Sequence, residues 1–504
     1  MRYEGPPRNP PTLAPSAAWL VLACLSCAAS KPADDAVRGE SAGLSDYTDM
    51  VAWSDQPPGL SPVDVPQFVA VTFDDNFVSG LSDVTGGMTW ATDFFRPLTN
   101  PAGSAIAGTF DAAPVRTTFF GNCVYLEDES TRQSWATAVE DGHEFGNHTV
   151  NHLHGGAFTV ENWTDEIAPC TAALTNVDSG IGVALDDVRG FRSPFLEYNE
   201  NLFAALKGQG LEYDSSVQSC WGEAEDGTNC AWPYTLDAGS KDADTLTAKF
   251  GTPGAPAAAG LWQVPPSALF VPPDDLAGQY GFTPGLRQRI PTDMPAPSFY
   301  EASTGRIAPL DITLFVDAGM SAAEVLATLK YTLDRRLSGN RAPLVFVAHT
   351  HVYASNYGAA PNAADAAERQ GAIEDFVAYA LANSSVRMRP VTDILSWMRV
   401  PVPLGGMVTM PVMDAGTPQG GSAGAAPDAG AMGGAGAAAP DAGTVGGGGA
   451  AGMTAAAGAP AASATPPSAP AGCSCTAVPA RSSPLLALLA PLLVAWRRRA
   501  RRSR

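Results

Sequence analysis

The sequence predicts an α/β protein in which a parallel sheet is surrounded by helices. Short apolar runs typical of buried strands recur over residues 62–402, as in "QFVAVTF", "RTTFF" and "PLVFVAH". Segments with the period of an amphipathic helix lie between these runs, and strands that alternate with helices favour a parallel sheet. At about 340 residues, this segment is also long enough for a barrel of alternating strands and helices.

Two of the intervening helices are marked at their ends. Ser321 and Glu324 form a capping box, and Gly339 can stop the helix that they begin. Asn199 can cap a second helix, which ends before Gly208. We therefore expect one helix to begin at Ser321 and another to run from about residue 199 to 207.

The N-terminal segments have the composition of an exported protein. Residues 1–30 contain a short apolar run preceded by Arg2 and Arg8, which is typical of a secretory signal. Within it, Cys24 or Cys27 can alternatively be a lipid-anchored cysteine. Residues 31–61 are polar and contain proline, which predicts a tether before the domain-sized segment 62–402.

The C-terminal segments predict a stalk and an anchor. Residues 403–475 are rich in Ala, Gly and Pro and cannot build a core, so we expect a disordered linker. Residues 476–504 join a short apolar run to an arginine cluster, an order that resembles the sorting tails of certain bacterial surface proteins. A short membrane anchor held by its basic end is the alternative. Both interpretations predict a domain outside the cytoplasm, secreted or tethered to the cell surface or membrane.

The chain is strongly acidic. Its formal net charge is −21, although residues 481–504 hold seven arginines and no acid. A surface of this sign repels nucleic acid, so we expect no nucleic-acid partner.

Four cysteines lie in the middle of the chain. In an oxidising compartment an even number of cysteines is expected to form disulfides. Only a short, polar and turn-rich segment separates Cys220 from Cys230, so these two are expected to pair. By elimination, Cys123 is then expected to pair with Cys170.

An acidic pair ends the first apolar run. The stretch "VAVTFDDN" closes on Asp74 and Asp75, and adjacent carboxylates are costly to ionise unless a cation neutralises one of them. His148 and His152 follow at i and i+4, on one face of a helical turn. Two histidines and one carboxylate suit zinc, with cobalt or nickel as alternatives. We therefore expect Asp75, His148 and His152 to bind one divalent metal and Asp74 to act as general base.

Further motifs follow in the order of a known family. "TFDD", "HTVNH", "RSPF" and the histidine of "VFVAHTH" resemble the motifs of the polysaccharide deacetylases of carbohydrate esterase family 4, which have the NodB-homology fold. "RGFRSPFLEYNENLFAALKGQGLEYDSSV", "WPYTLD" and "NRAP" are similar to its chitin-deacetylase-like branch. The resemblance covers about residues 66–398. It implies a distorted (β/α) barrel of seven or eight strands.

The resemblance also implies a reaction and a role for each matching residue. The reaction is the removal of N-acetyl groups from N-acetylglucosamine units by metal-activated water. Asp74 matches the base, and His349 matches the general acid, with His351 as the alternative. Arg192 matches the arginine that orients the base, and Asp214 resembles the acid that steadies this arginine.

Two more residues are implied to contact the substrate. The backbone N–H of Phe195 would help form the oxyanion hole, and Trp262 resembles an apolar wall of the acetyl pocket. His143 and His154 are expected beside the metal ligands rather than among them. Tyr198, Trp221 and Trp232 can be either core residues or sugar platforms.

Two other functions stay open. The same fold can serve as a surface carbohydrate-binding module without turnover, or as a hydrolase of a non-sugar amide. The N-acetylated polysaccharide can be chitin-like, peptidoglycan or an exopolysaccharide. We expect the chain to act as a monomer.

Overall fold

The computed structural model describes residues 45–405, except 107, 293, 295–298 and 359–363. The chain divides into two units, Met1–Gly416 and Thr417–Arg504. The expected signal segment with Cys24 and Cys27, most of the linker and the C-terminal tail lie outside the described residues. In the described part of the chain, no helix is long and apolar enough to cross a membrane.

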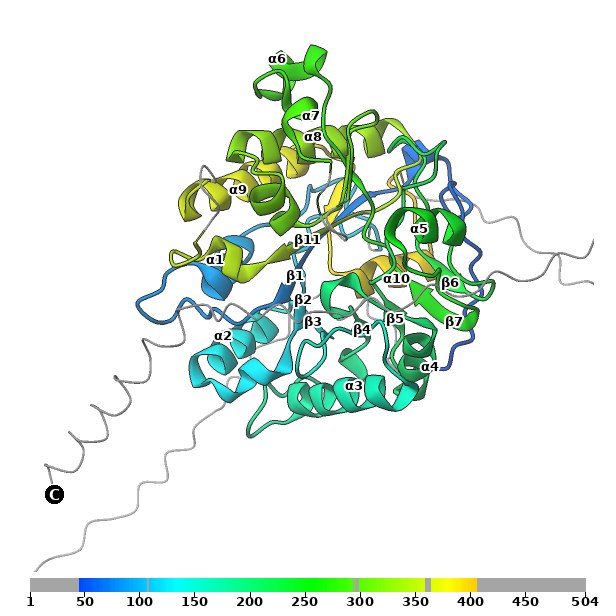
Figure 1. The fold of residues 1–504 in the computed structure, drawn as a ribbon, viewed down its shortest axis with the longest axis vertical. Helices are drawn as coiled ribbons and strands as arrows, with labels where there is room; N and C mark the ends of the chain where they lie inside the picture. The colour runs from blue at the N-terminus through cyan, green and yellow to red at the C-terminus, as the bar shows by residue number, and fades with distance from the viewer. Residues whose placement is uncertain (1–44, 107, 293, 295–298, 359–363, 406–504) are drawn as a thin grey trace, which may run out of the picture. The chain divides into compact units, whose positions relative to one another are not determined.

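A curled, mostly parallel sheet forms the centre of the first unit (Figure 1). Eight strands follow the order β11-β1-β2-β3-β4-β5-β7-β6, and β12 also pairs with β1. All these pairs are parallel except β6 with β7. This half-barrel confirms the expected α/β class. The strands are β1 Gln67–Asp75, β2 Thr118–Gly121, β3 Glu144–Asn147, β4 Gly190–Phe191, β5 Tyr213–Asp214, β6 Tyr234–Leu236, β7 Ala258–Gln263, β11 Leu344–His349 and β12 Val386–Met388.

Helices surround the curled sheet, and two of them begin where their capping residues predict (Figure 1). Ser321 and Glu324 form the expected capping box of α8, Ala322–Ser338. Asn199 caps α4, Glu200–Gly208. The other helices are α1 Gly87–Phe95, α2 Glu129–Glu140, α3 Val160–Thr175, α5 Ala243–Phe250, α6 Ala277–Tyr280, α7 Leu286–Arg289, α9 Ala366–Leu381 and α10 Val391–Arg399. A small antiparallel sheet joins β8 Leu269–Phe270, β10 Arg306–Ile307 and β9 Tyr300–Glu301.

Strand β1 lies inside the sheet and carries the acidic pair to its carboxyl edge. All of its residues are buried except Asp75, which is partly exposed. Its register places Asp74 opposite His349 of β11 and Asp75 opposite Gly121 of β2. The carboxyl ends of parallel strands meet at one edge, which is where ligands bind in such sheets. Residues that are far apart in the sequence are thereby brought to one place.

Residues 45–61 do not form the free tether that the sequence predicted. The Tyr47 hydroxyl donates to the Leu211 carbonyl at 2.9 Å, and the Val51 N–H donates to the Thr235 hydroxyl at 2.7 Å. These bonds fix residues 45–61, here named the N-terminal strap, against the barrel. The folded unit therefore includes residues from at least 45 onward.

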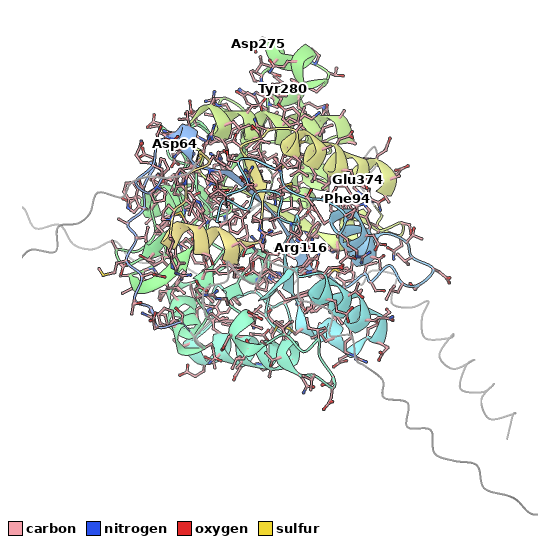
Figure 2. The ribbon with its side chains drawn as sticks, turned by 180° about the vertical axis from the view of Figure 1, so that it is seen from behind. Asp64, Phe94, Arg116, Asp275, Tyr280 and Glu374 are labelled. Carbon is pink, nitrogen blue, oxygen red and sulfur yellow. A yellow bond between two sulfur atoms is a disulfide. The ribbon has the colours of Figure 1, made fainter. Side chains whose placement is uncertain are left out.

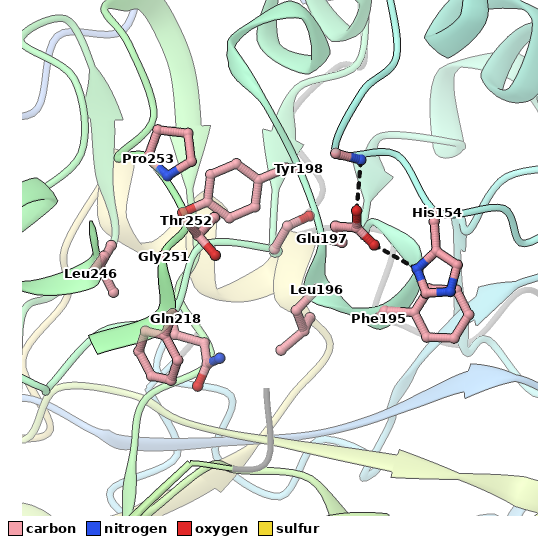
Figure 3. Close-up of a pocket in the computed structure, with 13 residues that line it drawn as sticks. His154, Phe195, Leu196, Glu197, Tyr198, Gln218, Leu246, Gly251, Thr252 and Pro253 are labelled. Carbon is pink, nitrogen blue, oxygen red and sulfur yellow. Dashed lines mark hydrogen bonds and ion pairs between the residues drawn. The ribbon is translucent and has the colours of Figure 1, made fainter. Parts of the chain in front are cut away.

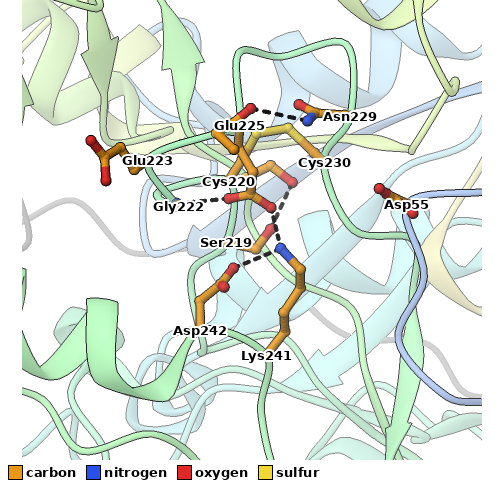
Figure 4. A network of polar contacts seen from close by, with 12 residues as sticks. Asp55, Ser219, Cys220, Gly222, Glu223, Glu225, Asn229, Cys230, Lys241 and Asp242 are labelled. Atoms are coloured by element: carbon orange, nitrogen blue, oxygen red, sulfur yellow. Dashed lines mark hydrogen bonds and ion pairs between the residues drawn. A yellow bond between two sulfur atoms is a disulfide. The ribbon is translucent and has the colours of Figure 1, made fainter. Parts of the chain in front are cut away.

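The four central cysteines form two disulfides, Cys123–Cys170 and Cys220–Cys230, which are the expected pairs. Figure 4 shows the second beside a polar network in which Lys241 pairs with Glu225. The first joins the turn after β2 to α3, close to the carboxyl edge of the sheet. It therefore restrains a segment next to the end of β1.

Candidate active site

Three side chains meet where β1 and β3 end. The Nε2 atom of His152 lies 3.2 Å from Oδ1 of Asp75, and the Nε2 atom of His148 lies 3.7 Å from it. The three potential ligand atoms all lie within 4.8 Å of one another. The structure thus brings together the three residues that the sequence analysis proposed as metal ligands.

The backbone is strained around this cluster. Asp75, Asn76, Thr149 and His152 all have positive φ angles, of 66°, 64°, 65° and 54°. For residues other than glycine this conformation costs about 1–3 kcal/mol each, and such strain gathers at functional sites. The amide of Asn76 donates to one carbonyl of β1 at 2.9 Å and to one of β2 at 3.1 Å, which holds the turn after the acidic pair.

The donor set fits a divalent metal. The Nδ1 atom of His148 lies 2.7 Å from the Arg192 carbonyl, which can only accept, so Nδ1 carries the proton and Nε2 presents a lone pair toward Asp75. Burial lowers the pKa of His152 to about 4, so this imidazole is neutral at neutral pH. Burial opposes ionisation of Asp75, but the neighbouring His148 and other histidines hold its pKa below the usual value. Two imidazoles and one carboxylate are ligands that zinc binds.

Asp74 is held by the buried guanidinium of Arg192. One Nη atom donates to Asp74 Oδ1 at 2.8 Å and to the Thr72 hydroxyl at 2.7 Å. The rest of the guanidinium donates to the carbonyl and the hydroxyl of Ser215, at 3.0 and 2.9 Å. Arg192 has no exposed surface, and a charge-assisted bond of this kind fixes the carboxylate in one orientation.

Asp214, the acid expected to steady Arg192, is hydrogen-bonded to Ser216 rather than to the guanidinium. The two oxygens of Asp214 accept from the hydroxyl and the N–H of Ser216, at 2.6 and 2.9 Å. Because successive residues along a strand point in opposite directions, the next residue, Ser215, reaches Arg192 instead. Burial raises the pKa of Asp214 to about 6. The hydroxyl of Ser216 also accepts the N–H of Ser193, so Asp214 supports the loop that follows Arg192.

His349 has a partner that the sequence analysis missed. The Oδ1 atom of the fully buried Asp311 lies 2.7 Å from His349 Nδ1, and its Oδ2 atom accepts the His349 backbone N–H at 2.7 Å. Burial by itself would lower the pKa of His349, but Asp311, followed by Asp75 and Asp74, raises it to about 9. His349 is therefore protonated at neutral pH. The only signal for Asp311 in the sequence is a single acid that follows an apolar stretch, and no motif marks it.

His351, the alternative acid, has different surroundings. Its ring stacks on Phe77 with 4.6 Å between centroids, and it lies 5.4 Å from the ring of His349. Burial and the charge of His349 lower its pKa to about 4. A neutral imidazole has no proton to give as an acid at neutral pH, which favours His349 for that role.

Phe195 lies between the cluster and open surface. Its ring is 4.6 Å from that of His152 and stacks on His154 at 4.1 Å, and the residue is 42% exposed. The residue has a positive φ of 58°, so its loop is strained too. Phe195 is thus positioned to contact a molecule bound beside the three clustered side chains.

Trp262 does not form a wall of the site. Its ring is fully buried, and its indole N–H donates to Asp49 of the N-terminal strap at 2.7 Å. The strand alternation turns the next residue, Gln263, toward Asp214, so Trp262 points to the other face of β7. The sequence expectation for Trp262 is therefore corrected.

The remaining candidates divide between the core and the surroundings of the site. His143 is buried and its Nδ1 accepts the Thr117 N–H at 3.1 Å, outside the metal cluster. Trp221 and Trp232 are buried core residues. Tyr198 lines a pocket beside Phe195.

The comparison with protein families agrees with this geometry. Residues 64–213 match the family model described as polysaccharide deacetylase. The matched segment contains the acidic pair of β1, the two histidines of the cluster and Arg192. No curated protein matches the chain.

Several solved structures are similar to the chain at low identity. A protein from Mycobacterium smegmatis described as a polysaccharide deacetylase is 19% identical, over 68% of this chain and 93% of that chain, with a TM-score of 0.37. A family 4 carbohydrate esterase from Streptomyces lividans is 19% identical, over 48% and 96%, with a TM-score of 0.22. A family 4 acetyl xylan esterase from Clostridium thermocellum is 21% identical, over 32% and 64%, with a TM-score of 0.21. At these TM-scores the likenesses carry no argument of their own.

The family match covers three of the motifs that predicted the resemblance, "TFDD", "HTVNH" and "RSPF", and ends before the histidine of "VFVAHTH". It supports a hydrolase that acts on acetyl groups. The resemblance is thereby confirmed for this segment: residues 64–213 are similar to the polysaccharide deacetylase family.

Proposed function

We propose that the chain is a metal-dependent enzyme that removes N-acetyl groups from N-acetylglucosamine units of a polysaccharide. The observation that carries the proposal is the close approach of Asp75, His148 and His152, whose ligand atoms lie within 4.8 Å. A paired carboxylate, Asp74, and a paired imidazole, His349, accompany this cluster at the ends of adjacent strands.

Asp75, His148 and His152 would hold the metal, with zinc favoured and cobalt or nickel as alternatives. When bound, such an ion supplies Lewis-acid chemistry that polarises a carbonyl and lowers the pKa of water. The proton transfers are assigned to side chains of the protein.

Asp74 is the proposed general base. Its carboxylate accepts the proton of the attacking water, and Arg192 keeps it oriented through the bond at 2.8 Å. Arg192 is a positioning residue, because the same guanidinium is anchored on Thr72 and Ser215.

His349 is the proposed general acid. Cleavage of an amide requires a proton on the departing nitrogen, and the imidazole of His349 carries one at neutral pH. Asp311 accepts a hydrogen bond from the Nδ1–H of His349, which leaves the Nε2–H to give its proton to the leaving amine. Phe195, whose loop follows Arg192, would stabilise the negative charge that develops on the carbonyl oxygen through its N–H.

The substrate and the location are extensions of this proposal. The family match supports a polysaccharide, and we propose an N-acetylated one such as chitin, peptidoglycan or an exopolysaccharide. The two disulfides are typical of an oxidising compartment, which supports export. We propose that the protein is exported and attached to the cell surface by its C-terminal tail.

The test separates an enzyme from a binding module. Acetate release from an N-acetylglucosamine oligomer is measured for the unmodified protein, for Asp74→Asn and for His148→Ala, with the bound metal quantified in each. We expect Asp74→Asn to keep the metal and to lose at least ~10²-fold in rate, as expected for a general base. His148→Ala should lose both, because it removes a ligand. Glycan binding without acetate release by the unmodified protein would favour the binding module, and full activity of Asp74→Asn would contradict the assigned base.

A further inference from the structure

A pocket of about 410 Å³ opens beside Phe195 (Figure 3). Its walls come from the loop 195–198, from Ser216 and Gln218, and from the end of α5 with the following residues 251–253. The Phe195 ring contacts His152 on one side and lines this pocket with His154 on the other. A glycan with one unit at the metal cluster therefore has a neighbouring unit within reach of the pocket.

Glu197 is fixed in the wall of this pocket. Its Oε2 atom lies 2.6 Å from Nδ1 of His154, and its Oε1 atom accepts the Gly156 N–H at 2.9 Å (Figure 3). A Cβ at Gly156 would lie 2.3 Å from Glu197 Oε1, so a larger residue there would displace the carboxylate. The carboxylate is thus held in place by the loop that also carries His154.

Gln218 adds an acceptor without a partner. The side chain is only 7% exposed, and its Oε1 atom has no hydrogen-bond partner among the described residues. Because the Oε1 atom itself is buried, a hydroxyl or N–H of a sugar can pair with it only if the amide turns toward the pocket. Apolar side chains of Leu196, Leu246 and Phe250 complete a surface suited to the carbon face of a sugar ring.

Glu197 is the one acidic side chain among the residues that line the pocket. No lysine or arginine is among the residues that line it, and its one histidine already pairs with Glu197. A carboxylate or phosphate on the bound unit would lie beside the Glu197 carboxylate, and the pocket offers it no cation besides the already paired His154. A neutral unit avoids this repulsion, and a unit with a free amine is attracted.

We propose that this pocket binds the sugar unit next to the one that is deacetylated, and that Glu197 selects a neutral or amine-bearing unit over an anionic one. The inference rests on the proposed function and narrows its substrate class. It favours a glycan of neutral or amino sugars over one in which each acetylated unit has an acidic neighbour.

The experiment compares two oligosaccharides of equal length. One contains only N-acetylglucosamine, and the other has a uronic acid next to the acetylated unit. We expect the unmodified enzyme to show a higher kcat/KM on the neutral oligomer. Glu197→Gln keeps an oxygen for the Gly156 N–H but removes the charge, and it should reduce the preference by roughly fivefold, as suits a partly exposed charge. Glu197→Lys should reduce the preference further.

A control variant changes the same charge elsewhere. Asp275→Asn lies at the tip of the projecting segment that carries α6, outside the pocket (Figure 2), and should leave the preference unchanged. An unchanged preference in Glu197→Gln, with acetate still released from the neutral oligomer, would overturn the inference and leave the proposed function standing. If the unmodified protein releases no acetate from either oligomer, the proposed function fails instead. In that case the dissociation constants of the two oligomers are compared. Tighter binding of the neutral oligomer that Glu197→Gln weakens would support the inference, and equal binding would overturn it.

Discussion

At the scale of single residues, the site depends on contacts between side chains, and only some of these contacts can be predicted from the sequence. His148 and His152 are visible because their spacing is local and Asp75 ends a recognisable strand. Asp311 is invisible because its bond to His349 joins residues 38 positions apart, and nothing in either stretch specifies the partner. Asp214 was assigned to Arg192, but the alternation of side chains along β5 gives that contact to Ser215.

The Asp311–His349 pair is expected to set the alkaline limb of the pH dependence if His349 is the proposed acid. A general acid works while it is protonated, so activity is expected to persist as the pH rises and to fall as it passes the pKa of His349, which Asp311 raises to about 9. A bound cation at Asp75 acts in the opposite sense and moves this limb below pH 9.

Replacing Asp311 tests the pair directly. Asp311→Asn removes the negative charge, so the alkaline limb of the kcat/KM profile should shift to lower pH, toward the ordinary pKa of 6.5. The rate at acidic pH should change less than the rate at alkaline pH. A matched His351→Gln variant should keep the position of the limb. A limb that does not move in Asp311→Asn would show that another group is the acid.

At the scale of elements, local signals located helices but not the strap. The capping asparagine of α4 and the capping box of α8 act within one helical turn, which is why the sequence predicted where these helices begin. The N-terminal strap is polar and contains proline, so its composition resembles a tether. Its bonds are long-range, as between Tyr47 and Leu211, and composition alone does not report them.

The strap gives Trp262 a structural role that can be measured. Trp262→Phe keeps most of the buried ring but removes the indole N–H that donates to Asp49. We expect the free energy of unfolding to fall by about 1.5–3 kcal/mol, as for the loss of a hydrogen bond to a charged group. Urea denaturation measures this loss. The KM for the oligomer should stay unchanged, whereas an increase in KM without loss of stability would restore Trp262 to the acetyl pocket.

At the scale of the whole molecule, the fold class followed from the alternation of apolar runs with helical segments. The number and order of the strands did not follow from it. Strands as short as β4 and β5 have two residues each, too few for any periodicity, and their place in the sheet is fixed by pairing with β3 and β7. The motifs nevertheless located the site, because catalytic side chains sit at strand ends that the apolar runs mark.

The disulfide Cys123–Cys170 links this architecture to stability. It closes a loop of 47 residues between the turn after β2 and α3, and a cross-link of that length should stabilise the fold by about 4 kcal/mol, largely by restricting the unfolded chain. The double variant Cys123→Ser, Cys170→Ser should therefore unfold at a clearly lower urea concentration. The Cys220–Cys230 bridge closes a loop of only 10 residues, so the double variant Cys220→Ser, Cys230→Ser should lose less stability, about 3 kcal/mol.

Because the first bridge adjoins the carboxyl edge of the sheet, its loss should also lower metal retention, measured by elemental analysis at a urea concentration where both variants stay folded. Equal metal retention in the two variants would show that the bridge stabilises the chain without holding the site.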